Sequence, residues 1–271
     1  MINHGLRYTE LSDLSYVRPA DGIRLLDMYL PDVDKPYPVL VFFHGGGLEG
    51  GERKGNNACV FQYLAEHGIA AVSADYRMYP KAVFPDYIND AATAVAYTVN
   101  YGKERGLFNR IYIGGSSAGA YLSMHLCFNQ RYLFEAGINN HEIYGYIFDA
   151  GQPTVHFNVL RERGMDQRRI CIDEAAALFY VNENFINSRF QPEMLFIIAD
   201  DDIPCRYEQN QLMIKTLEQF GYNMTKIAFR LMRGYKHCSY ISAQDPNGTF
   251  IYPAMIKQFI CNGAAGFGQH K

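Results

Sequence analysis

A serine between glycines is the residue of this chain best suited to act as a nucleophile. Ser117 lies in the sequence GSSAG at positions 115–119, after a strand-like run at 110–114 and before a helix-like run at 120–126. On such a sharp strand-to-helix turn, the hydroxyl is held away from the backbone, and flanking glycines remove side chains that would clash. The start of a helix also offers N–H groups that stabilise negative charge. The pattern therefore predicts a nucleophilic Ser117.

A nucleophilic serine needs a base, an acid that orients the base, and oxyanion donors, and three further segments carry suitable residues. The sequence HGGG at 44–47 follows an apolar run at 38–43, the sequence DDD at 200–202 follows a run at 194–199, and His237 follows a run at 226–232. Because the carboxyl ends of parallel strands meet at one edge of a sheet, we expect these segments to converge on Ser117. His237 suits the base that takes the hydroxyl proton, and an aspartate would fix its tautomer.

The elements that must position these residues alternate between strands and helices. This alternation is typical of βαβ units and predicts an α/β fold, with a mostly parallel sheet and helices on both faces, in a single domain over residues 1–271. Strands are expected at 25–30, 38–43, 69–74, 111–114, 144–148, 194–199 and 226–232. Helices are expected at 57–67, 86–101, 120–126, 206–220 and 249–261, and the glycine-rich stretch 263–268 is expected to fray.

Residues 151–191 interrupt this alternation. They contain no clear strand, but they hold a charged part at 161–164 and a helical part at 173–180. Connections this long without structure of their own are uncommon in compact domains. We therefore expect a small cap-like insertion over the carboxyl ends of the strands, with an ordinary crossover and surface loop as the alternative.

The composition narrows the kinds of partner. The 271 residues are 48% hydrophobic, enough for one large core, and the formal net charge of -3 without a basic run argues against nucleic acid or an anionic membrane. No apolar stretch approaches the roughly 18 residues of a membrane span, and no signal peptide is visible. The six cysteines form no CxxC pair and the histidines show no ligand spacing. We therefore expect no metal or other cofactor, and free thiols in a reducing cytoplasm.

Together these motifs resemble the α/β-hydrolase fold family, in its esterase branch with an HGGG motif, which includes hormone-sensitive-lipase-like and acetyl-esterase-like enzymes. The sequence DYRMYP at 75–80, followed by Phe84, Pro85 and Asp90, is similar to a segment of that family. The resemblance extends from about residue 25 to about residue 261. It implies a serine carboxylic-ester hydrolase that acts through an acyl-enzyme.

The resemblance also implies a role for each candidate residue. Ser117 would attack the ester and His237 would move the proton. The backbone N–H groups of Gly45, Gly46 and Ala118 would form the oxyanion hole.

The identity of the acid stays open among three aspartates. In related sequences the acid lies about nineteen residues before the glycine that ends the next helix, and counting back from Gly221 selects Asp202. Aligning Pro204 with a proline common in this loop selects Asp200 instead. We prefer Asp202, then Asp200, then Asp201.

Several neighbouring polar residues are expected to be structural. His44 is expected to pack or hydrogen-bond beneath the HGGG loop, and Glu49 and Arg53 are expected to be solvated charges. Cys205 and Cys238 are expected to be small packing residues.

The small insertion favours short acyl groups over long-chain lipids, with acetyl esters on carbohydrates among the candidates. A peptidase or amidase on the same scaffold, and a non-catalytic binding protein, are the alternatives. The expected partner is a small-molecule ester, a homo-oligomer is left open, and the expected location is cytoplasmic.

Overall fold

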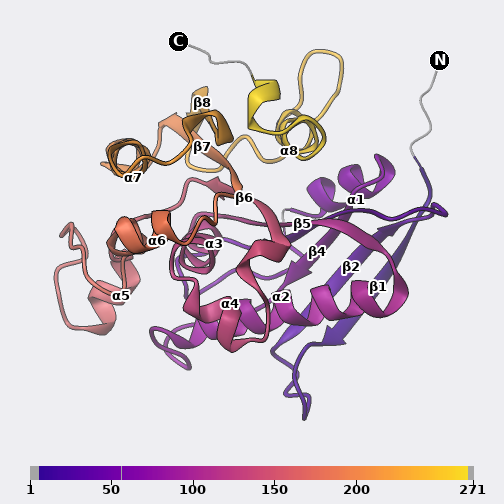
Figure 1. Ribbon diagram of the computed structural model, residues 1–271, viewed down its shortest axis with the longest axis horizontal. Helices are drawn as coiled ribbons and strands as arrows, with labels where there is room; N and C mark the ends of the chain where they lie inside the picture. Colours follow the sequence, from indigo (N-terminus) through magenta and orange to yellow (C-terminus); the bar gives the residue numbers. More distant parts are fainter. Residues whose placement is uncertain (1–5, 56, 268–271) are drawn as a thin grey trace.

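An eight-stranded sheet organises the computed structural model, which describes residues 6–55 and 57–267 (Figure 1). In order across the sheet, the strands are β1 (Tyr8–Ser15), β2 (Leu25–Pro31), β4 (Ala70–Ala74), β3 (Tyr37–Phe43), β5 (Phe108–Ser116), β6 (Ile143–Asp149), β7 (Glu193–Asp201) and β8 (Ile227–Lys236). Strand β2 runs antiparallel to β1 and β4, and β4, β3, β5, β6, β7 and β8 are parallel to one another. The predicted mostly parallel α/β sheet is confirmed.

Helices cover both faces of the sheet (Figure 1). One face packs against α1 (Ala58–Glu66) and α8 (Ile251–Asn262), and the other against α2 (Asp86–Arg105), α3 (Ala118–Phe128) and α7 (Arg206–Gln219). Along β3, Val39 and Val41 belong to the core that α2, α3 and α7 cover, whereas Leu40 and Phe42 belong to the core that α1 and α8 cover. Because successive side chains point to opposite buried faces, the strand has a continuous apolar sequence.

Strand β1 was not expected from the sequence. It lies at the edge of the sheet, where β2 is its one neighbour among the described strands, and all of its side chains are half-buried or exposed. An edge strand with little burial needs no alternation of apolar residues, so the signal that predicts strands is absent. Two other strands extend past their expected ends, β7 to Asp201 and β8 to Lys236, and Asp201 pairs with Lys236 in the sheet.

The expectation that residues 263–268 fray is wrong for their described part, 263–267; residue 268 lies outside the described residues. Ala264–Phe267 form a 3₁₀ turn, η4, whose Ala264 and Phe267 are buried. The Phe267 ring contacts Phe259 of α8, and Glu193 accepts a hydrogen bond from the Ala264 amide. Apolar burial thus outweighs the flexibility that the glycines suggest.

Residues 151–191 contain helical turns and no strand in the structure: α5 (Phe157–Glu162), η2 (Ala177–Tyr180) and α6 (Glu183–Asn187). The helix expected at 173–180 forms only over its last turn, because the Ala175 carbonyl accepts hydrogen bonds from Tyr121 and His125 of α3 instead. Helix α5 reaches the loop after β3, where Arg161 pairs with Glu49. In α6, by contrast, Phe185 packs on Phe128, at the far end of α3.

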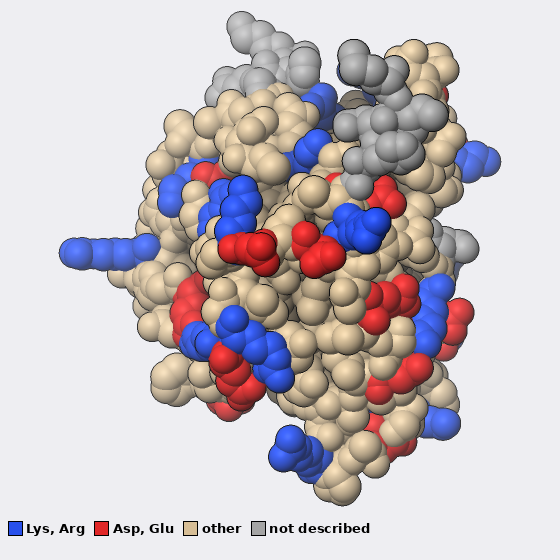
Figure 2. All heavy atoms as spheres, turned by 90° about the vertical axis from the view of Figure 1, so that its right-hand side faces the viewer, with Lys and Arg blue, Asp and Glu red and all other residues tan. Residues whose placement is uncertain are grey.

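Acidic and basic side chains are interspersed on the face that carries β1 and β2 (Figure 2). Within the described ranges, no helix combines the length and the apolar composition needed to cross a membrane.

Candidate active site

Ser117 occupies a strained turn between β5 and α3. Its backbone has a φ of 54° and a ψ of -112°, a region that residues other than glycine rarely adopt. The Ser117 amide donates to the Asp149 carbonyl at 2.7 Å, which ties the turn to the end of β6. The predicted strand–serine–helix arrangement is therefore present, and Ser117 remains 9% exposed.

Close packing against β3 explains the glycine that follows. A Cβ on Gly119 would lie 1.9 Å from the Phe43 carbonyl oxygen, far inside van der Waals contact. Helix α3 therefore starts against the end of β3 only because position 119 carries no side chain.

A continuous hydrogen-bond chain joins the serine, the histidine and one aspartate. The Ser117 hydroxyl lies 2.9 Å from Nε2 of His237, and Nδ1 of His237 lies 2.6 Å from Oδ1 of Asp202. Because the carboxylate can only accept, Nδ1 carries the proton and Nε2 is free to accept from the serine. The arrangement holds the imidazole in the tautomer that can take the proton of the Ser117 hydroxyl.

Of the three candidate aspartates, the structure brings only Asp202 to His237. The Asp202 side chain is 2% exposed. Burial raises its pKa, but the hydrogen bond and charge of His237 outweigh that effect and hold the pKa below its ordinary value. Asp200 is exposed and accepts from the Gly234 amide at 2.8 Å, and Asp201 is exposed and paired with Lys236 in the sheet.

The HGGG loop passes directly over the serine. A Cβ on Gly45 would lie 3.3 Å from the Ser117 Cβ, and Gly46 has a φ of 118° that favours glycine. In the described part of the chain, the N–H groups of Gly45 and Gly46 donate to no acceptor. The N–H of Ala118 begins α3, where helix geometry leaves it without an intrahelical partner.

A cluster of ion pairs around one buried arginine lies beneath this loop. Arg53 pairs with Asp13, Asp27 and Asp75, and its side chain is 9% exposed. The expectation that Arg53 is a solvated charge is therefore wrong: the loop folds back and buries it among carboxylates from β1, β2 and the segment after β4. Glu49 is exposed as expected, although it pairs with Arg161.

His44 has the structural position expected of it. It is buried and stacks on Tyr76 with ring centroids 4.5 Å apart, and its Nδ1 donates to the Gly45 carbonyl at 2.7 Å. Burial lowers its pKa, so the ring is neutral near pH 7.

Asp149, which the sequence analysis missed, lies behind the serine turn. It is fully buried at the end of β6, and it accepts hydrogen bonds from Ser116 at 2.5 Å and from Tyr240. Burial raises its pKa to about 6 despite these donors. The signal that could have identified it is the one that identified DDD at 200–202, an aspartate at the carboxyl end of a strand.

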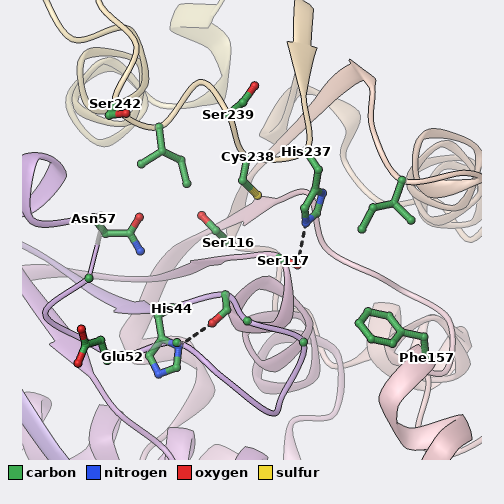
Figure 3. Close-up of a pocket in the computed structure, with 17 residues that line it drawn as sticks. His44, Glu52, Asn57, Ser116, Ser117, Phe157, His237, Cys238, Ser239 and Ser242 are labelled. Carbon is green, nitrogen blue, oxygen red and sulfur yellow. Dashed lines mark hydrogen bonds between the residues drawn. The ribbon is translucent and has the colours of Figure 1, made fainter.

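The same elements enclose a cavity of about 770 Å³ (Figure 3). Ser117 and His237 open into it, together with the HGGG loop, Phe157, Ile203 and the segment after His237. The ring of Phe157, from α5, lies 3.2 Å from where a Cβ on Gly47 would be. Among the described residues, no cluster of histidine, cysteine, aspartate and glutamate has the geometry to hold a metal ion.

This combination of fold and site defines a class. The chain has the α/β-hydrolase fold: it superimposes on a truncated carbohydrate esterase from gut microbiota with a TM-score of 0.73 and 17% identity, covering 96% of this chain and 97% of that one. It superimposes on esterase B from Lactobacillus rhamnosis with a TM-score of 0.69 and 19% identity, covering 94% and 85%.

Sequence comparison confirms the resemblance to esterases of the HGGG type. Residues 26–147 match the family model BD-FAE. The chain is 38% identical over 108 residues to esterase LipC of Mycobacterium tuberculosis, which covers 38% of this chain and 26% of that one. It is 37% identical over 100 residues to the probable isoprenylcysteine alpha-carbonyl methylesterase ICME of Oryza sativa subsp. japonica, covering 36% and 24%. The matched segments thus span about a quarter of these curated relatives.

Proposed function

We propose that this chain is a serine carboxylic-ester hydrolase. The observation that carries the proposal is the hydrogen-bond chain from Ser117 through His237 to Asp202, at 2.9 and 2.6 Å, beside a cavity wide enough for a small ester. The names of the relatives and structural neighbours, which are esterases, support the same activity.

The proposed reaction passes through an acyl-enzyme. Oγ of Ser117 attacks the ester carbonyl carbon while Nε2 of His237 takes the hydroxyl proton, and the positive imidazolium is stabilised by Asp202. His237 then gives this proton to the departing alcohol. Water, deprotonated by His237, attacks the acyl group and restores Ser117 as the acid leaves.

The oxyanion of each tetrahedral intermediate is assigned to the N–H groups of Gly45, Gly46 and Ala118. Each donor of this kind typically lowers the barrier by roughly 2.7–4 kcal/mol. The N–H groups of the two glycines, which donate to no acceptor among the described residues, and the closeness of Gly45 to Ser117 support this assignment.

The finer substrate assignment is a short acyl ester, with acetyl esters on carbohydrates as the leading candidates. Phe157 stands at one side of the serine and limits the room there, which supports a short acyl group.

We assign a cap function to the α5 part of residues 151–191, because α5 contacts the HGGG loop, and we retain a single domain over 1–271. A cytoplasmic location remains a prediction.

A fluorophosphonate probe tests the proposal. It should label the wild-type chain and the Ser12→Ala variant, which lacks an exposed serine of β1, and should fail to label Ser117→Ala. Hydrolysis of p-nitrophenyl acetate should exceed that of p-nitrophenyl palmitate and of aminoacyl-anilides. Labelling that persists in Ser117→Ala would reject Ser117 as the nucleophile, and faster cleavage of anilides would favour a peptidase.

A further inference from the structure

Asn57 is a buried amide that the local structure does not use. It stands at the start of α1, where asparagine commonly caps a helix with its side chain, yet the side chain makes no capping hydrogen bond. Asn57 is only 9% exposed, and its side chain has no hydrogen-bond partner in the described part of the chain. The amide atoms are not among the side-chain atoms that are sealed from solvent without a partner, because Asn57 lines a cavity, so a molecule bound in that cavity can take these hydrogen bonds.

The amide opens into the cavity that also contains Ser117 and His237. In Figure 3, Asn57 projects from the α1 side toward the middle of the cavity, while Phe157 lies on the opposite side of Ser117. The partner of the amide would therefore be a molecule bound beside the nucleophile.

The two ends of the cavity differ in chemistry. Glu52 and Ser242 line the Asn57 end, whereas Phe157 lines the other (Figure 3). The acyl and alcohol parts of an ester extend in different directions from the carbonyl carbon. A short apolar acyl group matches the Phe157 end, which leaves the Asn57 end for the alcohol part.

We infer that Asn57 forms a subsite that hydrogen-bonds hydroxyl groups on the alcohol part of the ester, an inference that rests on the proposed function. An amide both donates and accepts, so it can pair with two neighbouring hydroxyls of a polyhydroxylated alcohol. A site built to pair such groups discriminates strongly against a substrate that lacks them. Asn57 would thus make the enzyme selective for acyl esters of polyols and sugars.

Two substrates of matched alkyl length test the inference: glycerol monoacetate, which carries hydroxyls on its alcohol part, and propyl acetate, which does not. The wild type should favour glycerol monoacetate in kcat/KM. Asn57→Ala should reduce that preference by about 10- to 100-fold, mainly through KM, because the hydroxyls lose their partner. Asn57→Asp, which keeps a hydrogen-bond acceptor, should lose less of the preference for glycerol monoacetate. Asn89→Ala, which removes an exposed asparagine of α2, should leave the preference unchanged.

A thermal melt separates binding from a structural role. Because Asn57 makes no capping bond, Tm should change little in Asn57→Ala, and a large fall in Tm with an unchanged preference would overturn the inference. A wild type with no preference for glycerol monoacetate would also overturn it. If Asn57→Ala instead lost activity selectively on methyl lactate relative to methyl propionate, the hydroxyl that Asn57 binds would lie on the acyl part of the ester. That result would also contradict the inference. Failure of the wild type on every ester would instead reject the proposed function itself.

Discussion

At the scale of single residues, the site depends on where three side chains meet. Ser117 lies in a strained turn. The hydrogen bond to Asp202 keeps the proton on Nδ1 of His237, and the Asp202 carboxylate that accepts it is buried. The roles assigned to these residues make separate predictions.

The acid can be identified by substitution. Asp202→Asn should lower kcat on p-nitrophenyl acetate by about 10³- to 10⁴-fold, because asparagine would favour the wrong tautomer of His237. Asp200→Asn should stay within a few-fold of the wild type, since in the described part of the chain the Asp200 side chain accepts from the Gly234 amide and does not contact His237. A large loss in Asp200→Asn, with Asp202→Asn still active, would reverse the assignment.

Asp149 should make folding stability depend on pH. Its pKa is raised from 3.8 to about 6, so the folded chain binds more protons than the unfolded chain between those values. The stability that Asp149 contributes is therefore present at low pH and is lost as pH rises through about 6. An asparagine at this position would not titrate. The free energy of unfolding of Asp149→Asn, relative to the wild type, should rise by about 2–3 kcal/mol from pH 4 to pH 7.

Urea denaturation at a series of pH values measures this difference. The groups that face Asp149 are Ser116, Tyr240, Tyr252 and His237. Asp200→Asn, which removes an exposed carboxylate, is the control for a general effect of lost charge. A difference that stays flat, or that falls as pH rises, would show that Asp149 is not held protonated by burial.

The sequence was informative for residues that follow recognisable patterns. GSSAG, HGGG and the histidine after the last strand were visible as motifs, and Asp202 was the preferred aspartate. Arg53 and Asn57 were not recognised, because burial and the lack of a partner arise from how distant segments fold together. No local pattern distinguishes a buried arginine from a solvated one.

At the scale of elements, α5 forms one wall of the cavity. Phe157 packs on Gly47 of the HGGG loop, and Arg161 of the same helix pairs with Glu49 and lies 4.8 Å from the Tyr79 ring centroid. The helix therefore contacts the loop at two points, and its Phe157 ring lines the cavity on that side.

Removing this ring should change the preferred acyl length. Phe157→Ala should raise kcat/KM for p-nitrophenyl hexanoate relative to p-nitrophenyl acetate by about tenfold, since each added methylene in an apolar pocket is worth roughly 1–3 kcal/mol. Phe179→Ala, which removes an exposed ring of the same 151–191 segment, should leave the ratio unchanged. An unchanged ratio in Phe157→Ala would mean that the acyl group lies elsewhere.

Buried elements were predictable, and peripheral ones were not. Strand β3 is a continuous apolar run, and β4 is apolar except for Ser73, because both faces of these strands are covered. Strand β1 is largely exposed, and the turn η4 is fixed by burial of Phe267 against α8 and by Glu193, contacts distant in sequence. Such elements depend on tertiary contacts that a window of sequence does not contain.

At the scale of the whole molecule, Arg53 joins β1, β2 and the segment after β4 to the loop that passes over the serine. Asp27, one of its partners, is 1% exposed and would be left as an unpaired buried charge without it. Arg53→Met should lower the free energy of unfolding by about 3–5 kcal/mol.

The neighbouring cation provides the control for this prediction. Lys54→Met removes an exposed pair with Asp13 and should cost less than about 1 kcal/mol. Chemical denaturation of both variants measures the two effects. Equal, small losses would indicate that the carboxylates around Arg53 are stabilised by water rather than by this guanidinium.

The central claim is that Ser117 carries the acyl group during turnover. Rapid acid quenching during hydrolysis of p-nitrophenyl acetate, followed by mass spectrometry of the digested protein, tests it most directly. The account predicts one added acetyl group on the peptide that contains Ser117, and none in Ser117→Ala. An acetyl group found on another residue, or turnover that persists at the wild-type rate in Ser117→Ala, would contradict it.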